Sequence, residues 1–138
     1  MQSAVLSETA QIPREVVPRT ILVIDDDEDY RLLVRTLLVR AGYRVLEASN
    51  GLAGLRFVAK TRVDLLITDM IMPEHEGVET ILVVRHMHPR LKVVAISGVT
   101  GCREYLDLAD RLGANATLEK GVVPKLLVGT VRSLIESR

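Results

Sequence analysis

The sequence predicts a doubly wound α/β domain, in which helices cover both faces of a five-stranded parallel sheet. Two observations support this prediction. Short, almost wholly apolar runs alternate along the chain with segments whose apolar residues recur every three to four positions. That alternation is typical of buried parallel strands connected by amphipathic helices. The chain also has 138 residues, which is about the size of one domain and enough to bury a sizeable core.

The first strand and the first helix have the clearest pattern. Residues 21–24 form a continuous apolar run, which predicts a buried strand. From Tyr30 to Ala41 the apolar residues recur at helical spacing, and Gly42 follows as a residue that favours a helix end. Asp27 precedes this helix and is its predicted N-cap.

The same alternation continues to the end of the chain. Further strands are predicted at residues 43–47, 63–68, 91–96 and 116–118, and further helices around residues 52–59, 78–85, 105–112 and 127–135. Met70, Met72 and Met87 are expected to fill gaps between helices and sheet. Residues 1–19 show no clear period, so we expect a flexible leader there and one domain over residues 20–138.

Composition and charge exclude several classes of protein. Eighteen basic residues balance eighteen acidic ones, so no charge footprint for nucleic acid is visible. No apolar run is long enough to span a membrane, and residues 1–19 lack the pattern of a signal peptide. The single cysteine, Cys102, excludes an internal disulfide and a cysteine-based zinc site. We therefore expect a cytoplasmic protein that binds neither nucleic acid nor membrane by itself.

Five polar side chains fall where predicted strands end. Asp25 and Asp26 follow the first strand, Asp69 ends the third, Ser97 ends the fourth and Lys120 follows the fifth. The carboxyl ends of parallel strands share one edge of the sheet, so these side chains should form a site. Neighbouring carboxylates repel each other unless a cation compensates them, and an oxygen-only site suits Mg²⁺ shared with a phosphate. The hydroxyl and the ammonium suit the remaining oxygens of a phosphoryl group.

The segments that carry these residues resemble the four signature segments of response-regulator receiver domains. They read ILVIDDD (21–27), DLLITDMIMP (64–73), VVAISG (93–98) and GANATLEK (113–120), in this order and each at a strand end. The resemblance covers about residues 20–137. It implies the flavodoxin-like fold with strand order 2-1-3-4-5.

The resemblance also implies which residues take part in the chemistry. Asp69 would accept a phosphoryl group from a histidine kinase or a histidine phosphotransferase. Asp26 and Asp69 would ligate Mg²⁺ together with the backbone carbonyl of Ile71, and Asp25 would hold the ion through water. These roles fit phosphoryl transfer, in which positioning and charge neutralisation do most of the catalysis.

The remaining implied roles concern contact with the phosphoryl group and the read-out. Lys120 would pair with the phosphoryl group, and Ser97 would hydrogen-bond to it. The signal would reach an unknown downstream protein through the face built from the fourth helix, the fifth strand and the last helix. The protein would be a monomer, or it would form a weak dimer through the same face.

Four positions depart from the family pattern or tune it. Thr117 stands where the family usually has an aromatic residue that takes part in switching, and Gly121 stands where it usually has proline. In the family, the positions that Ile71 and Val99 occupy tune hydrolysis of the acyl phosphate. Both are apolar and offer nothing to orient an attacking water, so we expect a comparatively long-lived phosphoryl state.

Two other functions remain open. The run from Asp25 to Asp27 also fits the start of a haloacid-dehalogenase-type phosphatase, in which Asp25 would be the nucleophile and Asp27 the acid/base. Asp69 would then have no role, and Asp29 stands where that family has Thr or Val. The second alternative is an interaction module that works without phosphorylation, which the departures at Thr117 and Gly121 favour. The receiver interpretation, with no further enzymatic activity, accounts for more of the residues.

Overall fold

The computed structural model describes residues 17–72, 76–98 and 103–137. Five strands form one parallel sheet in the order β2-β1-β3-β4-β5, which confirms the predicted fold. The strands are β1 (Thr20–Ile24), β2 (Arg44–Ala48), β3 (Leu65–Asp69), β4 (Lys92–Ser97) and β5 (Ala116–Glu119). Most of the predicted leader, residues 1–16, lies outside the described residues.

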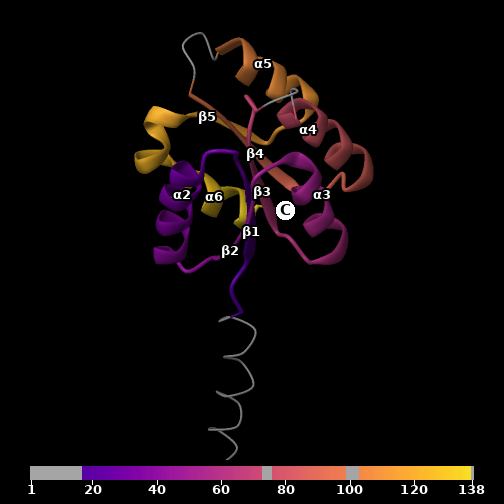
Figure 1. Ribbon diagram of the computed structural model, residues 1–138. Helices are drawn as coiled ribbons and strands as arrows, with labels where there is room; N and C mark the ends of the chain where they lie inside the picture. The colour runs from indigo at the N-terminus through magenta and orange to yellow at the C-terminus, as the bar shows by residue number, and fades with distance from the viewer. Residues whose placement is uncertain (1–16, 73–75, 99–102, 138) are drawn as a thin grey trace, which may run out of the picture.

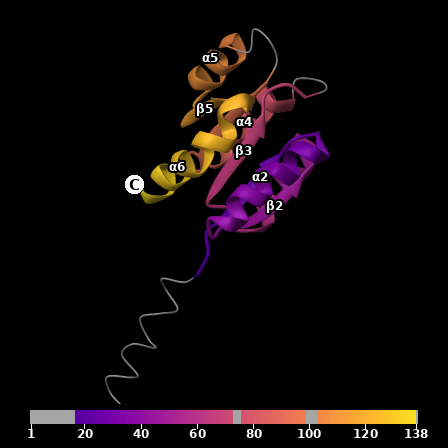
Figure 2. The ribbon, with the colours of Figure 1, turned by 90° about the vertical axis from the view of Figure 1, so that its left-hand side faces the viewer.

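Five helices alternate with the strands and cover both faces of the sheet (Figure 1). They are α2 (Glu28–Arg40), α3 (Gly51–Lys60), α4 (Glu76–Met87), α5 (Arg103–Leu112) and α6 (Val123–Glu136), with a 3-10 turn, η2 (Lys120–Val122), before α6. Helices α2 and α6 lie on one face, toward the viewer in Figure 2, and α3, α4 and α5 lie on the other. Within the described part of the chain, no helix has the length and apolarity needed to cross a bilayer.

Helix α2 begins and ends as the sequence predicts. The Asp27 side chain accepts hydrogen bonds from the backbone N–H groups of Asp29 and Tyr30, at 3.0 and 3.2 Å, and so caps two of the free donors of the first turn. After the last turn Gly42 has φ of +98°, a conformation that side chains with a Cβ rarely adopt. The N-cap at Asp27 and the glycine at position 42 therefore set the two ends of the helix.

The core consists of two apolar layers, one on each face of the sheet. Ile21 and Val23 of β1 pack toward α2 and α6, and Leu22 and Ile24 pack toward the three helices of the other face. This follows from the two-residue period of a strand, which leaves both faces of a central parallel strand apolar. All five residues of β1 are buried, so Asp25 follows directly from the buried centre of the domain.

The methionine prediction is correct at two positions and wrong at the third. Met70 and Met72 are buried between helices and sheet. Met87 is 63% exposed. The side of α4 that meets the sheet carries Ile81 and Val84, and Met87 lies in the last turn away from that layer.

Candidate functional site

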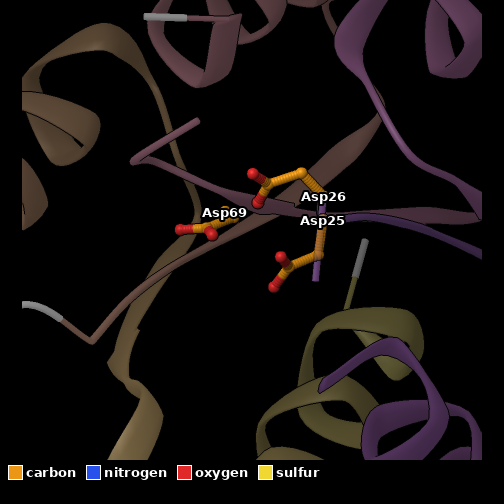
Figure 3. A group of neighbouring side chains, drawn as sticks. All are labelled: Asp25, Asp26 and Asp69. Atoms are coloured by element: carbon orange, nitrogen blue, oxygen red, sulfur yellow. The ribbon is translucent and has the colours of Figure 1, made fainter. Parts of the chain in front are cut away.

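Three carboxylates meet at the carboxyl edge of the sheet. Asp25 and Asp26 follow β1 and Asp69 ends β3, and one oxygen from each lies within 4.8 Å of the other two. Figure 3 shows their side chains converging on a common space. Asp25 and Asp69 are 3% and 5% exposed, while Asp26 is exposed. The sequence prediction that these residues lie together is confirmed.

One cation lies among these acids. Lys120 begins η2 directly after β5, and its Nζ lies 3.2 Å from Oδ2 of Asp25 and 3.2 Å from Oδ2 of Asp69. When all groups are ionised, three carboxylates and one ammonium leave two negative charges in excess. A divalent cation would neutralise that excess.

Burial and neighbouring charges shift the pKa values of Asp25 and Lys120. The pKa of Asp25 is raised to about 6, mainly by burial and also by the Asp69 carboxylate, against the opposing effects of the Asp27 N–H and of Lys120. Burial by itself lowers the pKa of Lys120, but the carboxylates of Asp69 and Asp25 outweigh burial and the net pKa is raised. Lys120 therefore stays charged at neutral pH.

The strand end that carries Asp69 is held by its own backbone and by a close helix contact. The Ile71 N–H donates to Oδ1 of Asp69 at 3.1 Å, which leaves Oδ2 toward Lys120. At the start of α4, Gly77 packs so closely that a Cβ there would lie 2.3 Å from the Asp69 carbonyl oxygen. Glycine at position 77 thus lets the helix approach the backbone of the strand end closely.

Ser97 contributes a hydroxyl that has no partner among the described residues. It ends β4, is fully buried, and its Oγ accepts or donates no hydrogen bond within them. A buried hydroxyl without a partner is costly, so one that persists at a strand end suits an incoming polar group. Next to it, a Cβ on Gly98 would lie 2.7 Å from Cδ of Lys120, so the lysine stem passes directly over this glycine.

The donor set fits Mg²⁺ better than a softer metal. The three side chains offer only carboxylate oxygens, with two negative charges beyond what Lys120 balances. The Ser97 hydroxyl, for which the described part of the chain offers no partner, and the Lys120 ammonium could contact an anion beside such an ion. Together these groups have the chemistry that Mg²⁺ and a phosphoryl group would need.

Some contributors were not singled out from the sequence. Gly77 acts through close packing, which no local pattern reveals. Arg31 donates from Nη1 to the Asp25 carbonyl oxygen and pairs with Glu47 at 3.3 Å, so it holds the end of β1. Tyr30 lies over Lys120, with its ring centroid 4.4 Å from Nζ. The charge of Arg31 and the aromatic ring of Tyr30, one turn after the acids, were the only available signals.

The positions that depart from the family pattern lie around the site. Thr117 pairs with Ala95 in the β4–β5 ladder and is half-buried. Gly121 lies in η2, where a Cβ would meet nothing within 4 Å, so the backbone does not require glycine there. Ile71 is half-buried beside Asp69, and Val99 lies outside the described residues.

Comparison with known proteins identifies the family. Residues 21–132 match the family model of the response regulator receiver domain, so the chain belongs to that family. It is a receiver domain, the phosphoacceptor module of two-component signalling. The predicted strand order and fold agree with this assignment.

Individual relatives agree with the family assignment. The chain is 33% identical over 118 residues to the DNA-binding transcriptional regulator NtrC of Azospirillum brasilense, covering 86% of this chain and 24% of that protein. It is 30% identical over 94 residues to sporulation initiation phosphotransferase F of Bacillus subtilis, covering 68% and 75%. The chain thus spans about a quarter of the length of the first relative.

Solved structures show the same fold. The response regulator protein TrrA of Thermotoga maritima, crystallised in complex with Mg²⁺–BeF, superposes with a TM-score of 0.75 at 28% identity, covering 84% of this chain and 98% of that one.

Proposed function

We propose that Asp69 is the residue that accepts the phosphoryl group. The observation that carries this proposal is its geometry: Asp69 ends a central strand, shares a cluster with Asp25 and Asp26, and lies 3.2 Å from the Lys120 ammonium. The carboxylate is thus held next to the only described cation of the site. Asp25 lies in the same cluster, but it follows strand β1, whereas Asp69 is itself the last residue of strand β3.

In this reaction a carboxylate oxygen of Asp69 attacks the phosphorus of a phosphohistidine. The new P–O bond forms as the P–N bond breaks. The electron pair of the P–N bond leaves with the imidazole, which takes up a proton. Lys120 contacts an oxygen of the transferred group, and the buried Ser97 hydroxyl donates to another. The product is an aspartyl phosphate.

The same reaction requires a cation, and the residues that would hold Mg²⁺ are Asp25, Asp26, Asp69 and the backbone carbonyl of Ile71. Bound there, Mg²⁺ would neutralise charge on the phosphoryl oxygens and align the reacting atoms. The complex of TrrA with Mg²⁺–BeF supports this assignment. So does the excess of negative charge among the three acids.

The partners follow from the proposed chemistry. A histidine kinase or a histidine phosphotransferase would supply the phosphoryl group, and the cytoplasm is the expected compartment. Residues 20–138 would form the receiver domain after a flexible leader. The read-out would use α5, β5 and α6, which would also mediate any weak dimer, and the chain itself would bind no nucleic acid.

Acetyl phosphate and Mg²⁺ test the proposal through the intact mass of the protein. We expect the wild type to gain one phosphoryl group and Asp69→Asn to gain none. Asp64→Asn is the matched control, because Asp64 lies at the opposite edge of the sheet, and it should gain the group normally.

Each rival function predicts a different outcome of this experiment. A haloacid-dehalogenase-type phosphatase would keep phosphatase turnover in Asp69→Asn and lose it in Asp25→Asn. An interaction module that works without phosphorylation would show no mass gain in the wild type. Either result would contradict the proposal.

A further inference from the structure

Tyr30 contacts Lys120 twice, through two different parts of the side chain. The phenol hydroxyl donates to the Lys120 carbonyl oxygen at 3.3 Å, and the ring face lies 4.4 Å from the Lys120 Nζ. The two residues are ninety positions apart in sequence. Tyr30 belongs to the first turn of α2, so one aromatic side chain connects this helix to the turn after β5.

The carboxylate contacts of Lys120 depend on the charge state of the site. Without a metal ion, the ammonium is held by Asp25 and Asp69 at 3.2 Å each. A divalent cation among the same carboxylates would neutralise their charge and repel the ammonium. The two ion pairs therefore weaken under the very conditions in which phosphoryl transfer takes place.

The contact with the aromatic ring does not depend on that charge. The attraction between an ammonium and an aromatic face comes from the ring quadrupole and strengthens when the contact is shielded from water. Tyr30 is half-buried, and only 24% of the Lys120 side chain is exposed. A metal ion bound to the carboxylates would therefore not remove this attraction.

We propose that Tyr30 is a positioning residue for phosphoryl transfer, which keeps the Lys120 ammonium beside Asp69 when metal and phosphoryl group replace its carboxylate contacts. The hydroxyl fixes the lysine backbone and the ring face fixes the ammonium. This role rests on the proposed function of Asp69.

A purely structural role for Tyr30 is the competing explanation, because its ring also packs against the core between the sheet, α2 and α6. Tyr43 provides a matched comparison: it is half-buried and packs against the same core cluster. Its ring makes no contact with Lys120 among the recorded interactions of the described residues. Loss of packing alone would therefore affect both tyrosines alike.

Three variants separate the two explanations in a phosphoramidate assay with saturating Mg²⁺. Tyr30→Leu should be phosphorylated about threefold to tenfold more slowly than the wild type, as expected for loss of one cation–π contact. Tyr30→Phe keeps the ring and should stay within about twofold of the wild type. Tyr43→Leu should react at the wild-type rate, and thermal unfolding confirms that each variant is folded.

An independent measurement is the NMR shift of the Lys120 side-chain protons. The ring current of Tyr30 should move the protons next to Nζ upfield in the wild type and in Tyr30→Phe, and not in Tyr30→Leu. The upfield shift should persist when Mg²⁺ is added. Loss of the shift on addition of Mg²⁺ would overturn the proposal, because the ring would then no longer hold the ammonium.

The kinetic outcomes also distinguish this proposal from the underlying function. A Tyr30→Leu variant as fast as the wild type, or Tyr30→Leu and Tyr43→Leu slowed equally, would overturn the role of Tyr30 alone. A wild type that takes no phosphoryl group would overturn the function of Asp69, and the positioning role with it.

Discussion

The carboxylate charge of Asp64, at the amino ends of the strands, is compensated by neighbouring cations. The carboxylate charges of Asp25 and Asp69, at the carboxyl ends, are compensated only in part. Asp64 lies 3.8 Å from Nη1 of Arg19 and 3.4 Å from Nε of Arg62, and it accepts a hydrogen bond from the Thr20 N–H at 2.8 Å. This carboxylate has two cations and a backbone donor of its own. It ties the start of β1 to the residue just before β3.

At the carboxyl edge Asp25, Asp26 and Asp69 lie together, and within the described residues only Lys120 is recorded in ion pairs with this cluster, with Asp25 and Asp69. A partly buried carboxylate with its own partners serves the fold, whereas a group of carboxylates that outnumbers its cations leaves room for another cation. The residue type is the same at both edges. The difference in charge compensation supports the proposal that the carboxyl edge is the reactive one.

Apart from the loss of Asp69 itself, the largest effect is expected on removing the cation of the carboxyl edge. Lys120→Met should slow phosphorylation by acetyl phosphate about a hundredfold, because a donor to the phosphoryl oxygens is lost. The same variant should bind Mg²⁺ more tightly, since no ammonium then competes for Asp25 and Asp69. Phosphorylation rates and isothermal calorimetry measure the two effects.

The exposed Lys125 of α6 is the control for this change, and Lys125→Met should leave both quantities unaltered. A Lys120→Met variant that is phosphorylated at the wild-type rate would show that the ammonium only compensates the carboxylate charge of the metal-free site.

Proton competition should weaken Mg²⁺ binding at low pH. The pKa of Asp25 is raised to about 6, so at pH 5 a proton must leave before the ion binds, and Mg²⁺ affinity should be about tenfold lower than at pH 7.5. Because this folded-state pKa lies above the unfolded value of 3.8, the contribution of Asp25 to the unfolding free energy is present below about pH 4 and lost as the pH rises through about 6.

Added Mg²⁺ should therefore raise the unfolding temperature more at pH 7.5 than at pH 5, which thermal unfolding with and without the ion would measure. Asp25→Asn should abolish this difference between the two pH values. Equal stabilisation of the wild type at both would refute the shifted pKa of Asp25.

The site was predictable from the sequence because strand ends determine it. Once residues 21–24 and 63–68 are assigned as parallel strands, Asp25 and Asp69 must share an edge. Tyr30 and Gly77 were missed for a physical reason: a ring over an ammonium and a helix touching a backbone depend on side-chain rotamers and packing distances. Spacing along the chain carries no information on either.

Helix faces were predicted less well than strand ends. Leu52, Leu82 and Leu108 lie in the segments 52–59, 78–85 and 105–112 that were predicted to be helices, yet they are 62%, 50% and 37% exposed. These helices contain more apolar residues than their sheet-facing sides can bury, so periodicity identifies the helix but not its buried face. Leu108 lies on α5, which belongs to the proposed read-out face.

A smaller effect is expected at the balanced edge. Asp64→Asn should reduce the unfolding free energy by about 1–2 kcal/mol, because a charge-assisted hydrogen bond to Thr20 and the contacts with Arg19 and Arg62 are lost. Urea unfolding measures the change, with the exposed Asp107→Asn as a control expected to be neutral. A loss of Mg²⁺ binding in Asp64→Asn would contradict the separation of the two edges.

The lifetime of the aspartyl phosphate would show whether any group at the carboxyl edge activates water for hydrolysis. Ile71 and Val99 offer no polar group to orient a water, so the aspartyl phosphate should persist well beyond seconds after the donor is removed. Intact mass recorded over time gives the decay. Loss within seconds would mean that another group activates the water.

The most direct test is to locate the phosphoryl group within the protein. Phosphorylated protein is reduced with borohydride, which converts an aspartyl phosphate to homoserine, and the peptides are sequenced by mass spectrometry. We predict homoserine at position 69 and intact aspartates at positions 25, 26 and 64. Homoserine at position 25, or unmodified aspartate at position 69, would contradict the assignment of the reactive oxygen to Asp69.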